Sequence, residues 1–202
     1  ADPEFTVNNL INSAYGCAGE RCMAGSVAVT VENAGEKVLP LLREALDAMK
    51  VGPTDRDPAA EMGPVVTKGH LEKVRGYIEQ GLSAGANLYR DGRSVKVPET
   101  PNGFYLGPTI FDQTHTEMSI VKDEIFGPVL SVIRTDDLEN AIALCNSSGF
   151  GNAAVLFTGS GRTAREFRHS VSAGMIGINV SVPAPMAFFP FSGWNGSFYG
   201  DL

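Results

Sequence analysis

The sequence is poor in cysteine, in positive charge and in long apolar runs, and each shortage excludes a class of protein. Its three cysteines, Cys17, Cys22 and Cys145, are an odd set too sparse for a disulfide scaffold, so reduced thiols are expected. With 16 Lys and Arg against 23 Asp and Glu, the net charge of −7 excludes a nucleic-acid surface. The apolar runs fall far short of the roughly 20 residues that cross a bilayer, so no membrane partner is expected. No export leader is visible, which predicts a cytoplasmic protein, or a mitochondrial matrix protein if the source is eukaryotic.

What remains is a composition of 43% hydrophobic and 19% charged residues, which fits one globular unit with a full core. Apolar periodicity predicts helices at 5–14, 36–49, 68–84, 137–146 and 163–171. It predicts strands at 26–31, 86–89, 104–111, 129–134, 153–157 and 175–180. Asp136 or Thr135 is expected to cap the helix at 137–146. Alternating strands and helices, with continuously apolar strands, predict an α/β fold: a mainly parallel sheet with helices on both faces.

The segment "TGSGRTA" at 158–164 has the spacing of a dinucleotide-binding fingerprint between a strand and a helix. Such a fingerprint needs an acidic residue about 20 positions further on to hold a ribose hydroxyl. The sequence there is "INVSVPAPM", which contains no carboxylate. We therefore interpret Gly159 and Gly161 as turn residues.

Two of the thiols stand in the glycine-rich stretch "YGCAGERCMAGSVAVTV". Cys17 and Cys22 are five residues apart, which is not the spacing of a zinc knuckle or a redox pair. The histidines, His70, His115 and His169, are scattered, so no metal site is predicted. A Cys–His hydrolase or acyltransferase stays open, because any of these histidines could approach a thiol in the folded protein.

Cys22 has the better surroundings for a nucleophile. Gly19 frees backbone amides close to the thiol, and Arg21 places a cation beside it. Both effects favour the thiolate, which is the reactive form of cysteine. Cys17 lacks these neighbours and is expected to be a packing thiol.

The motif "YGCAGERC" resembles the catalytic-thiol motif of the aldehyde dehydrogenase superfamily, with Cys22 at the position of the nucleophile. It departs from that motif at two positions: Glu20 replaces the usual glutamine, and Cys17 stands where asparagine is common. "KDEIFGPVLSV" is similar to the cofactor-contact segment of the superfamily. The resemblance implies that NAD is the cofactor, that Glu124 binds the nicotinamide ribose and that Phe126 packs beside the nicotinamide ring. "NGFYLGPTIF", "NAAVLFTG", "SAGMIGINV" and the closing loop "PFSGWNGSFYGD" are further matches, in the expected order.

Within the superfamily, "GERCMA" and "NVSVPAPMAFFPFSGWNGSFYGD" resemble the methylmalonate-semialdehyde dehydrogenase branch, whose members make acyl-CoA. The resemblance implies NAD-dependent oxidation and decarboxylation of malonate or methylmalonate semialdehyde through a Cys22 thioester, with coenzyme A as co-substrate. Arg21 would hold the substrate carboxylate by paired hydrogen bonds, a geometry that lysine cannot copy.

The resemblance also implies that residues 1–202 are the thiol-bearing catalytic domain of a longer enzyme. The NAD-binding domain, the general base and a terminal strand would then lie outside this chain, which alone is expected to be inactive, and the full-length protein would form a homo-oligomer. Two alternatives stay open: a hydrolytic aldehyde dehydrogenase for another acidic aldehyde, and a non-catalytic scaffold module.

Overall fold

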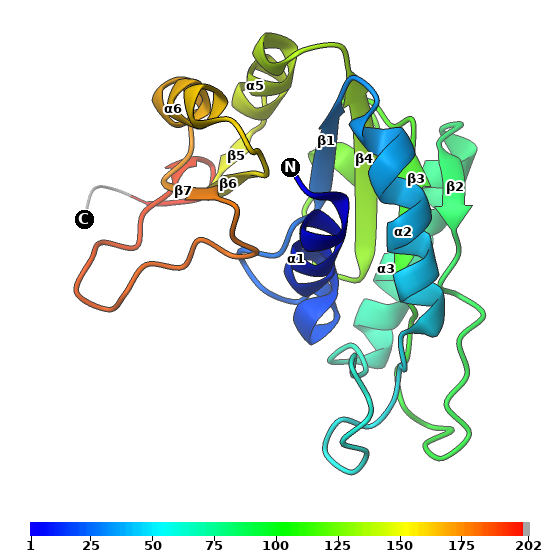
Figure 1. Cartoon of the computed structure of the whole chain (residues 1–202). Coiled ribbons are helices and arrows are strands. Elements are labelled where there is room, and N and C mark those ends of the chain that lie inside the picture. The colour runs from blue at the N-terminus through cyan, green and yellow to red at the C-terminus, as the bar shows by residue number, and fades with distance from the viewer. Residues whose placement is uncertain (200–202) are drawn as a thin grey trace.

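The computed structural model describes residues 1–199, in which helices cover both faces of a four-stranded sheet (Figure 1). The sheet order is β1 (Val27–Val31), β4 (Val129–Thr135), β3 (Thr109–Asp112) and β2 (Asn87–Arg90). β1 and β3 run parallel to the central β4, and β2 is antiparallel to β3 at one edge. The predicted α/β fold with a mainly parallel sheet is therefore confirmed.

Alternate side chains of the strands face two separate hydrophobic clusters. Ile110 packs with residues of α1 (Pro3–Tyr15) and α2 (Ala34–Ala48), which lie side by side in Figure 1. The next residue, Phe111, packs with residues of α3 (Lys68–Ser83) and of the short α4 (Ser119–Lys122). Both faces of the sheet are thus covered, which explains why all of β3 and the first five residues of β4 are buried.

Side-chain caps fix where several of the helices begin. Asp2 accepts a hydrogen bond of 2.8 Å from the Phe5 amide at the start of α1, and Thr67 accepts from the His70 amide at the start of α3. Asp137 accepts from the Asn140 amide at 2.7 Å and so caps α5 (Leu138–Asn146). The predicted caps, Asp136 and Thr135, were wrong by one and two residues, because Asp137 is the residue with the extended backbone that a cap requires.

A smaller pair of parallel strands, β6 (Ala153–Leu156) and β7 (Met175–Ile178), lies apart from the main sheet, to its left in Figure 1. Phe167 of α6 (Gly161–Ser170) packs with α5 over these strands. Ser160 caps α6 by accepting a hydrogen bond from the Thr163 amide. Gly159 thus lies in the bend before the helix, as we interpreted it, whereas the interpretation of Gly161 as a turn residue was wrong, because Gly161 is the first residue of α6.

Two predicted segments differ from the structure. The strand expected at 104–111 begins only at Thr109, because the preceding residues bond to loops: the Phe104 carbonyl accepts from Val65, and the Gly107 amide donates to Gly92. The tail, expected to be a loop throughout, contains β8 (Trp194–Asn195), which pairs with β5 (Phe150–Gly151). The last residues of the predicted closing loop lie outside the described residues. No helix within 1–199 is long and apolar enough to cross a bilayer.

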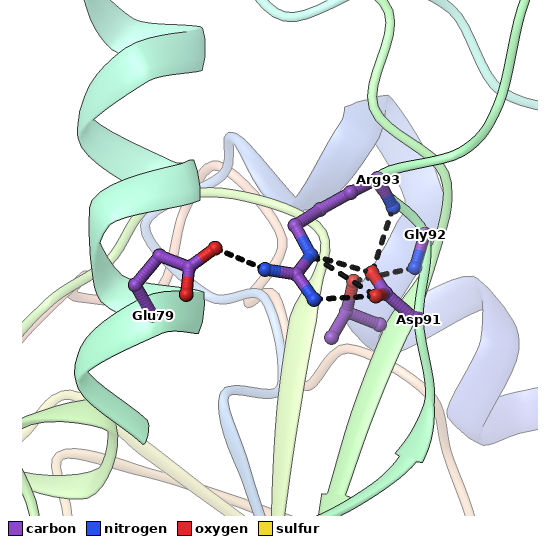
Figure 2. A network of polar contacts seen from close by, with 5 residues as sticks. Glu79, Asp91, Gly92 and Arg93 are labelled. Atoms are coloured by element: carbon purple, nitrogen blue, oxygen red, sulfur yellow. Dashed lines mark hydrogen bonds and ion pairs between the residues drawn. The ribbon is translucent and has the colours of Figure 1, made fainter. Parts of the chain in front are cut away.

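A polar network ties the loop after β2 to α3 (Figure 2). The Arg93 guanidinium donates to Asp91, with Nη2 to Oδ2 at 2.6 Å, and reaches across to Glu79 on α3. The hydrogen bonds from Arg93 hold the pKa of the Asp91 carboxyl below its usual range. The Gly92 amide donates to Thr109 Oγ1 at 3.1 Å, which joins the loop to β3 as well. Since the Glu79 side chain is largely exposed, its ion pair adds little stability.

Tyr15, the last residue of α1, anchors that helix to the sheet. Its side chain is 1% exposed, and its hydroxyl donates to the Thr109 carbonyl of β3 at 3.1 Å. Burial raises the pKa of the Tyr15 phenol well above its ordinary value, because the phenolate would lose its hydration.

Replacement of Tyr15 by phenylalanine is expected to alter how stability depends on pH. The raised pKa means that the unfolded chain loses this proton above about pH 10 while the folded chain keeps it, so stability falls by about 1.4 kcal/mol per pH unit. The Tyr15→Phe variant should lack this component, although it loses about 1 to 2 kcal/mol at neutral pH with its buried hydrogen bond. Urea unfolding from pH 7 to 11 measures both effects. Tyr199→Phe, at a fully exposed position, is the control, and equal slopes for Tyr15→Phe and the wild type would contradict the assignment.

Candidate active site

Residues 16–24, which we call the thiol loop, follow α1 directly. They start with a single 3₁₀ turn, Gly16–Gly19, in which Cys17, Ala18 and Gly19 have left-handed φ angles of 53°, 54° and 71°. This conformation is unfavourable for residues other than glycine, so it persists only where the surrounding contacts hold it. The strained turn reverses the chain between α1 and β1 and places Cys22 on the surface.

Cys22 is exposed, and of its two backbone polar groups only the carbonyl is held by a hydrogen bond within residues 1–199. Its carbonyl accepts a hydrogen bond of 2.8 Å from Asn152 Nδ2, just before β6. Within residues 1–199 its backbone amide donates to no protein acceptor. An exposed thiol beside a free amide is the arrangement needed to attack a carbonyl carbon and hold the resulting oxyanion.

The other two cysteines have different surroundings. Burial raises the pKa of the Cys145 thiol on α5, which disfavours its thiolate. Cys17 is exposed, so its expected role as a packing thiol was wrong: it lies in the strained surface turn.

The Arg21 guanidinium turns back toward α1. Nη2 donates to the carbonyls of Asn12 and Ser13 at the end of that helix, the latter at 3.2 Å, and so caps carbonyls that the helix leaves unpaired. A Cβ atom at Gly16 would lie 2.6 Å from Nη2, so only glycine allows this approach. Within the described part of the chain, Nη1 has no hydrogen bond, and Nε is buried without one. A paired grip on a carboxylate through Nη1 and Nη2 would therefore compete with the helix cap.

Residues 123–128, which we call the cofactor segment, lie between α4 and β4. Glu124 is exposed and makes no hydrogen bond through its side chain to any residue of 1–199. Phe126 has a left-handed φ of 58°, and its side chain is 37% exposed. The segment is tied to the core where the Pro128 carbonyl accepts from Thr109 and the Asp123 carboxylate accepts from Tyr77.

The thiol loop and the cofactor segment touch through their backbones. A Cβ atom on Gly19 would lie 2.3 Å from the Gly127 carbonyl oxygen, and one on Gly127 would lie 2.7 Å from the Val74 side chain. Glycine at both positions allows this contact. Thus the fold brings together the segments that carry Cys22 and Phe126, although they lie far apart in the sequence.

Sequence reasoning assigned no structural role to two residues that join these parts, and it named one of them, His70, only as a histidine that could approach a thiol. His70 on α3 lies 2.5 Å from the Phe126 carbonyl oxygen and 3.3 Å from a Glu20 carboxylate oxygen. Asn152 holds the Cys22 carbonyl. Neither residue carries a local signal, since both act through contacts distant in sequence; Asn152 stands inside the "NAAVLFTG" match, and Glu20 was noted only as a departure from the motif.

A sequence profile of the aldehyde dehydrogenase family matches residues 1–202. This chain belongs to the aldehyde dehydrogenase family. The resemblance predicted from the "YGCAGERC" and "KDEIFGPVLSV" motifs is therefore confirmed.

Individual relatives agree with this placement in the aldehyde dehydrogenase family. The malonate-semialdehyde dehydrogenase of Halalkalibacterium halodurans is 50% identical over all of this chain and 41% of its own length. The crystal structure of methylmalonate-semialdehyde dehydrogenase from Oceanimonas doudoroffii superposes with a TM-score of 0.96 at 42% identity, covering 100% of this chain and 41% of that one. A protein from Sinorhizobium meliloti 1021, assigned provisionally as a methylmalonate-semialdehyde dehydrogenase and solved with NAD, gives a TM-score of 0.96 at 41% identity with the same coverage.

The predicted resemblance to the methylmalonate-semialdehyde dehydrogenase branch is borne out by the names of these relatives. The chain spans 41% of the length of each of them. The similarity thus extends over the whole of this chain but over less than half of each relative.

Proposed function

We propose that this chain is the catalytic, thiol-bearing domain of a longer, CoA-acylating dehydrogenase for malonate or methylmalonate semialdehyde. The observation that supports this most is the exposed Cys22 thiol on a loop in backbone contact with the segment that carries Glu124 and Phe126. The similarity to malonate- and methylmalonate-semialdehyde dehydrogenases supports the substrate class. The NAD-binding domain, the general base and a terminal strand would belong to the remainder of the longer enzyme.

Cys22 is the proposed nucleophile. Its thiolate adds to the aldehyde carbon of the substrate, which converts the carbonyl oxygen into an oxyanion. The free Cys22 amide can donate a hydrogen bond to that oxyanion. The Asn152 bond holds the Cys22 carbonyl, which belongs to the next peptide group, and so limits movement of the Cys22 backbone as the charge develops.

The exposed groups of the cofactor segment fit a nicotinamide nucleotide. The Glu124 carboxylate is free to accept hydrogen bonds from ribose hydroxyls, and the Phe126 ring offers an exposed apolar surface for a planar ring. The segment would hold the nicotinamide of NAD as a hydride acceptor, and loss of a hydride from the carbon attached to the Cys22 sulfur would leave a thioester on Cys22. The backbone contact of Gly19 with Gly127 supports the alignment of these two reacting groups.

The Cys22 thioester has a carboxylate two carbons along the acyl chain. Loss of carbon dioxide leaves the electron pair on the thioester carbonyl as an enolate, and protonation of the enolate gives an acetyl or propionyl group. The thiol of coenzyme A then attacks the acyl carbon, releases the Cys22 thiolate and forms the CoA thioester. The Cys22 sulfur thus carries the substrate through all three steps: oxidation, decarboxylation and transfer to coenzyme A.

Arg21 is proposed to assist binding of the substrate carboxylate. Because Nη2 is engaged by α1, the support lies in Nη1, which has no hydrogen bond within residues 1–199. A single charge-assisted bond from Nη1 would replace the paired geometry expected from the sequence. Formation of a homo-oligomer by the full-length enzyme and a cytoplasmic or matrix location stay predictions.

The product of the reaction tests this proposal. The full-length protein that contains this chain should convert malonate or methylmalonate semialdehyde, NAD and coenzyme A into NADH and acetyl-CoA or propionyl-CoA, detected by absorbance and mass spectrometry. Free acid formed without a CoA thioester would favour the hydrolytic alternative instead. Lack of both products, with the protein folded, would favour a non-catalytic scaffold.

A further inference from the structure

We propose that His70 is a positioning residue that holds Phe126, and through it the cofactor segment, against the thiol loop. The inference rests on the proposed function for the role of Phe126, but its structural part does not depend on turnover. His70 lies in the first turn of α3, an element that neither motif of the family resemblance includes.

The contacts of His70 define the role of Nε2 and the orientation of the ring. Nε2 lies 2.5 Å from the Phe126 carbonyl oxygen and 3.3 Å from Glu20 Oε1. Since both partners are acceptors, Nε2 must carry the hydrogen and donate it. The imidazole also stands edge-on to the Phe126 ring, with ring centres 6.5 Å apart and an angle of 72° between the planes.

This junction lies largely out of solvent and includes three segments. The side chains of His70 and Glu20 are 15% and 13% exposed. Glu20 Oε1 also accepts a hydrogen bond of 3.2 Å from the Val66 amide, before α3. Glu20, in the thiol loop, is the residue that replaces the usual glutamine of the motif, and here its carboxylate meets a histidine. The junction therefore connects the thiol loop, the start of α3 and the cofactor segment.

Phe126 needs such a support because its backbone is left-handed, with a φ of 58°. A non-glycine residue stays in this region only where neighbouring contacts overdetermine it. Beyond it in the chain, Gly127 is confined between Gly19 and Val74. Loss of the His70 bond would free the Phe126 carbonyl, so the residue could return to a common backbone region and its ring would change direction.

The two sides of the junction differ in where their other anchors lie, because the cofactor segment is bonded at Asp123 and Pro128, on either side of Phe126, but not, within the described chain, at Phe126 itself. The thiol loop is also held by Arg21 on the end of α1 and by Asn152 on the Cys22 carbonyl. Within residues 1–199, His70 is the hydrogen-bond donor to the Phe126 carbonyl. Removal of the imidazole should therefore displace Phe126 while Cys22 keeps its place.

The test compares His70→Leu with His70→Gln in the full-length protein. In His70→Leu we expect KM for NAD to rise about tenfold and NADH formation in the first turnover to slow about tenfold, the size of effect that one lost positioning contact produces. Alkylation of Cys22 by iodoacetamide without NAD should stay within about twofold of wild type, because the thiol loop keeps its other anchors. His70→Gln, whose amide can donate to both acceptors, should restore the kinetics to within about threefold. His169→Leu, an exposed histidine on α6, is the matched control.

Hydrogen exchange provides a readout that needs no activity. Peptides covering the cofactor segment should exchange faster in His70→Leu than in wild type or His169→Leu, while peptides of the core strand β4 should exchange as in wild type. Unchanged exchange together with an unchanged KM for NAD in His70→Leu would overturn the proposal. If the wild-type protein forms no NADH, the proposed function fails, and faster or unchanged exchange still decides whether His70 holds the segment.

Discussion

Replacement of Cys22 by alanine is expected to abolish the proposed reaction, with NADH formation in the full-length protein falling by about 10⁴-fold or more. Covalent catalysis is lost entirely when the nucleophile is removed, and the binding groups that remain cannot form the thioester. Stopped-flow and steady-state NADH assays with semialdehyde and coenzyme A measure the loss. Because the Cys22 side chain is exposed, the melting temperature should not change.

Cys17→Ala is the matched control for this experiment. Cys17 is also exposed and stands in the same thiol loop, so the two variants differ in which sulfur is removed. We expect Cys17→Ala to retain activity within about threefold. Activity that survives in Cys22→Ala but disappears in Cys17→Ala would reverse the assignment of the nucleophile.

Gly19→Ala is expected to have the next largest effect. A Cβ atom at Gly19 would lie 2.3 Å from the Gly127 carbonyl oxygen, and the φ of 71° is unfavourable for alanine. Since the neighbour is backbone, the thiol loop and the cofactor segment must separate. A displacement of about 1 Å between reacting groups costs about a hundredfold in rate, so first-turnover NADH formation should fall by at least that factor.

Gly76→Ala on α3 separates this effect from a general intolerance of glycine replacement. A Cβ atom there meets nothing within 4 Å, and alanine favours the helix by about 0.5 to 1 kcal/mol over glycine. The control should be active and as stable as wild type or more so. Circular dichroism establishes that Gly19→Ala still folds; a folded Gly19→Ala enzyme with wild-type rates would show that the close contact is not needed.

The longer secondary-structure elements could be predicted from sequence because each has a clear period and terminal signals. The helix expected at 68–84 is α3 (Lys68–Ser83), and the strand expected at 129–134 is β4 (Val129–Thr135). The short elements α4, β5 and β8 were missed, since two to four residues carry no measurable period. The strand expected at 26–31 is β1 (Val27–Val31), whose residues are only half-buried in this structure.

The residues of the candidate site could be predicted from the sequence where a local motif carries them, but the orientation of their side chains could not. Cys22, Glu124 and Phe126 could be nominated because local motifs carry them, and the structure leaves all three exposed at the surface. Adjacency in sequence predicted that Arg21 would serve the thiol and its substrate. The fold instead directs Nη2 of its guanidinium to the end of α1, because unpaired helix carbonyls are strong acceptors within reach. Contacts between distant segments decide such orientations, and a linear pattern does not encode them.

The hydrogen bond from Asn152 to the Cys22 carbonyl spans two separately built parts of the protein. Asn152 stands at the start of the small β6–β7 sheet, where its own carbonyl accepts from Met175, whereas Cys22 leads into β1 of the large sheet. The side-chain amide of Asn152 thus links the two sheets. If the two sheets slid past each other, the backbone of Cys22 would rotate with them. A rigid β6–β7 sheet is therefore a condition for a constant angle between the Cys22 sulfur and the aldehyde carbon that it attacks.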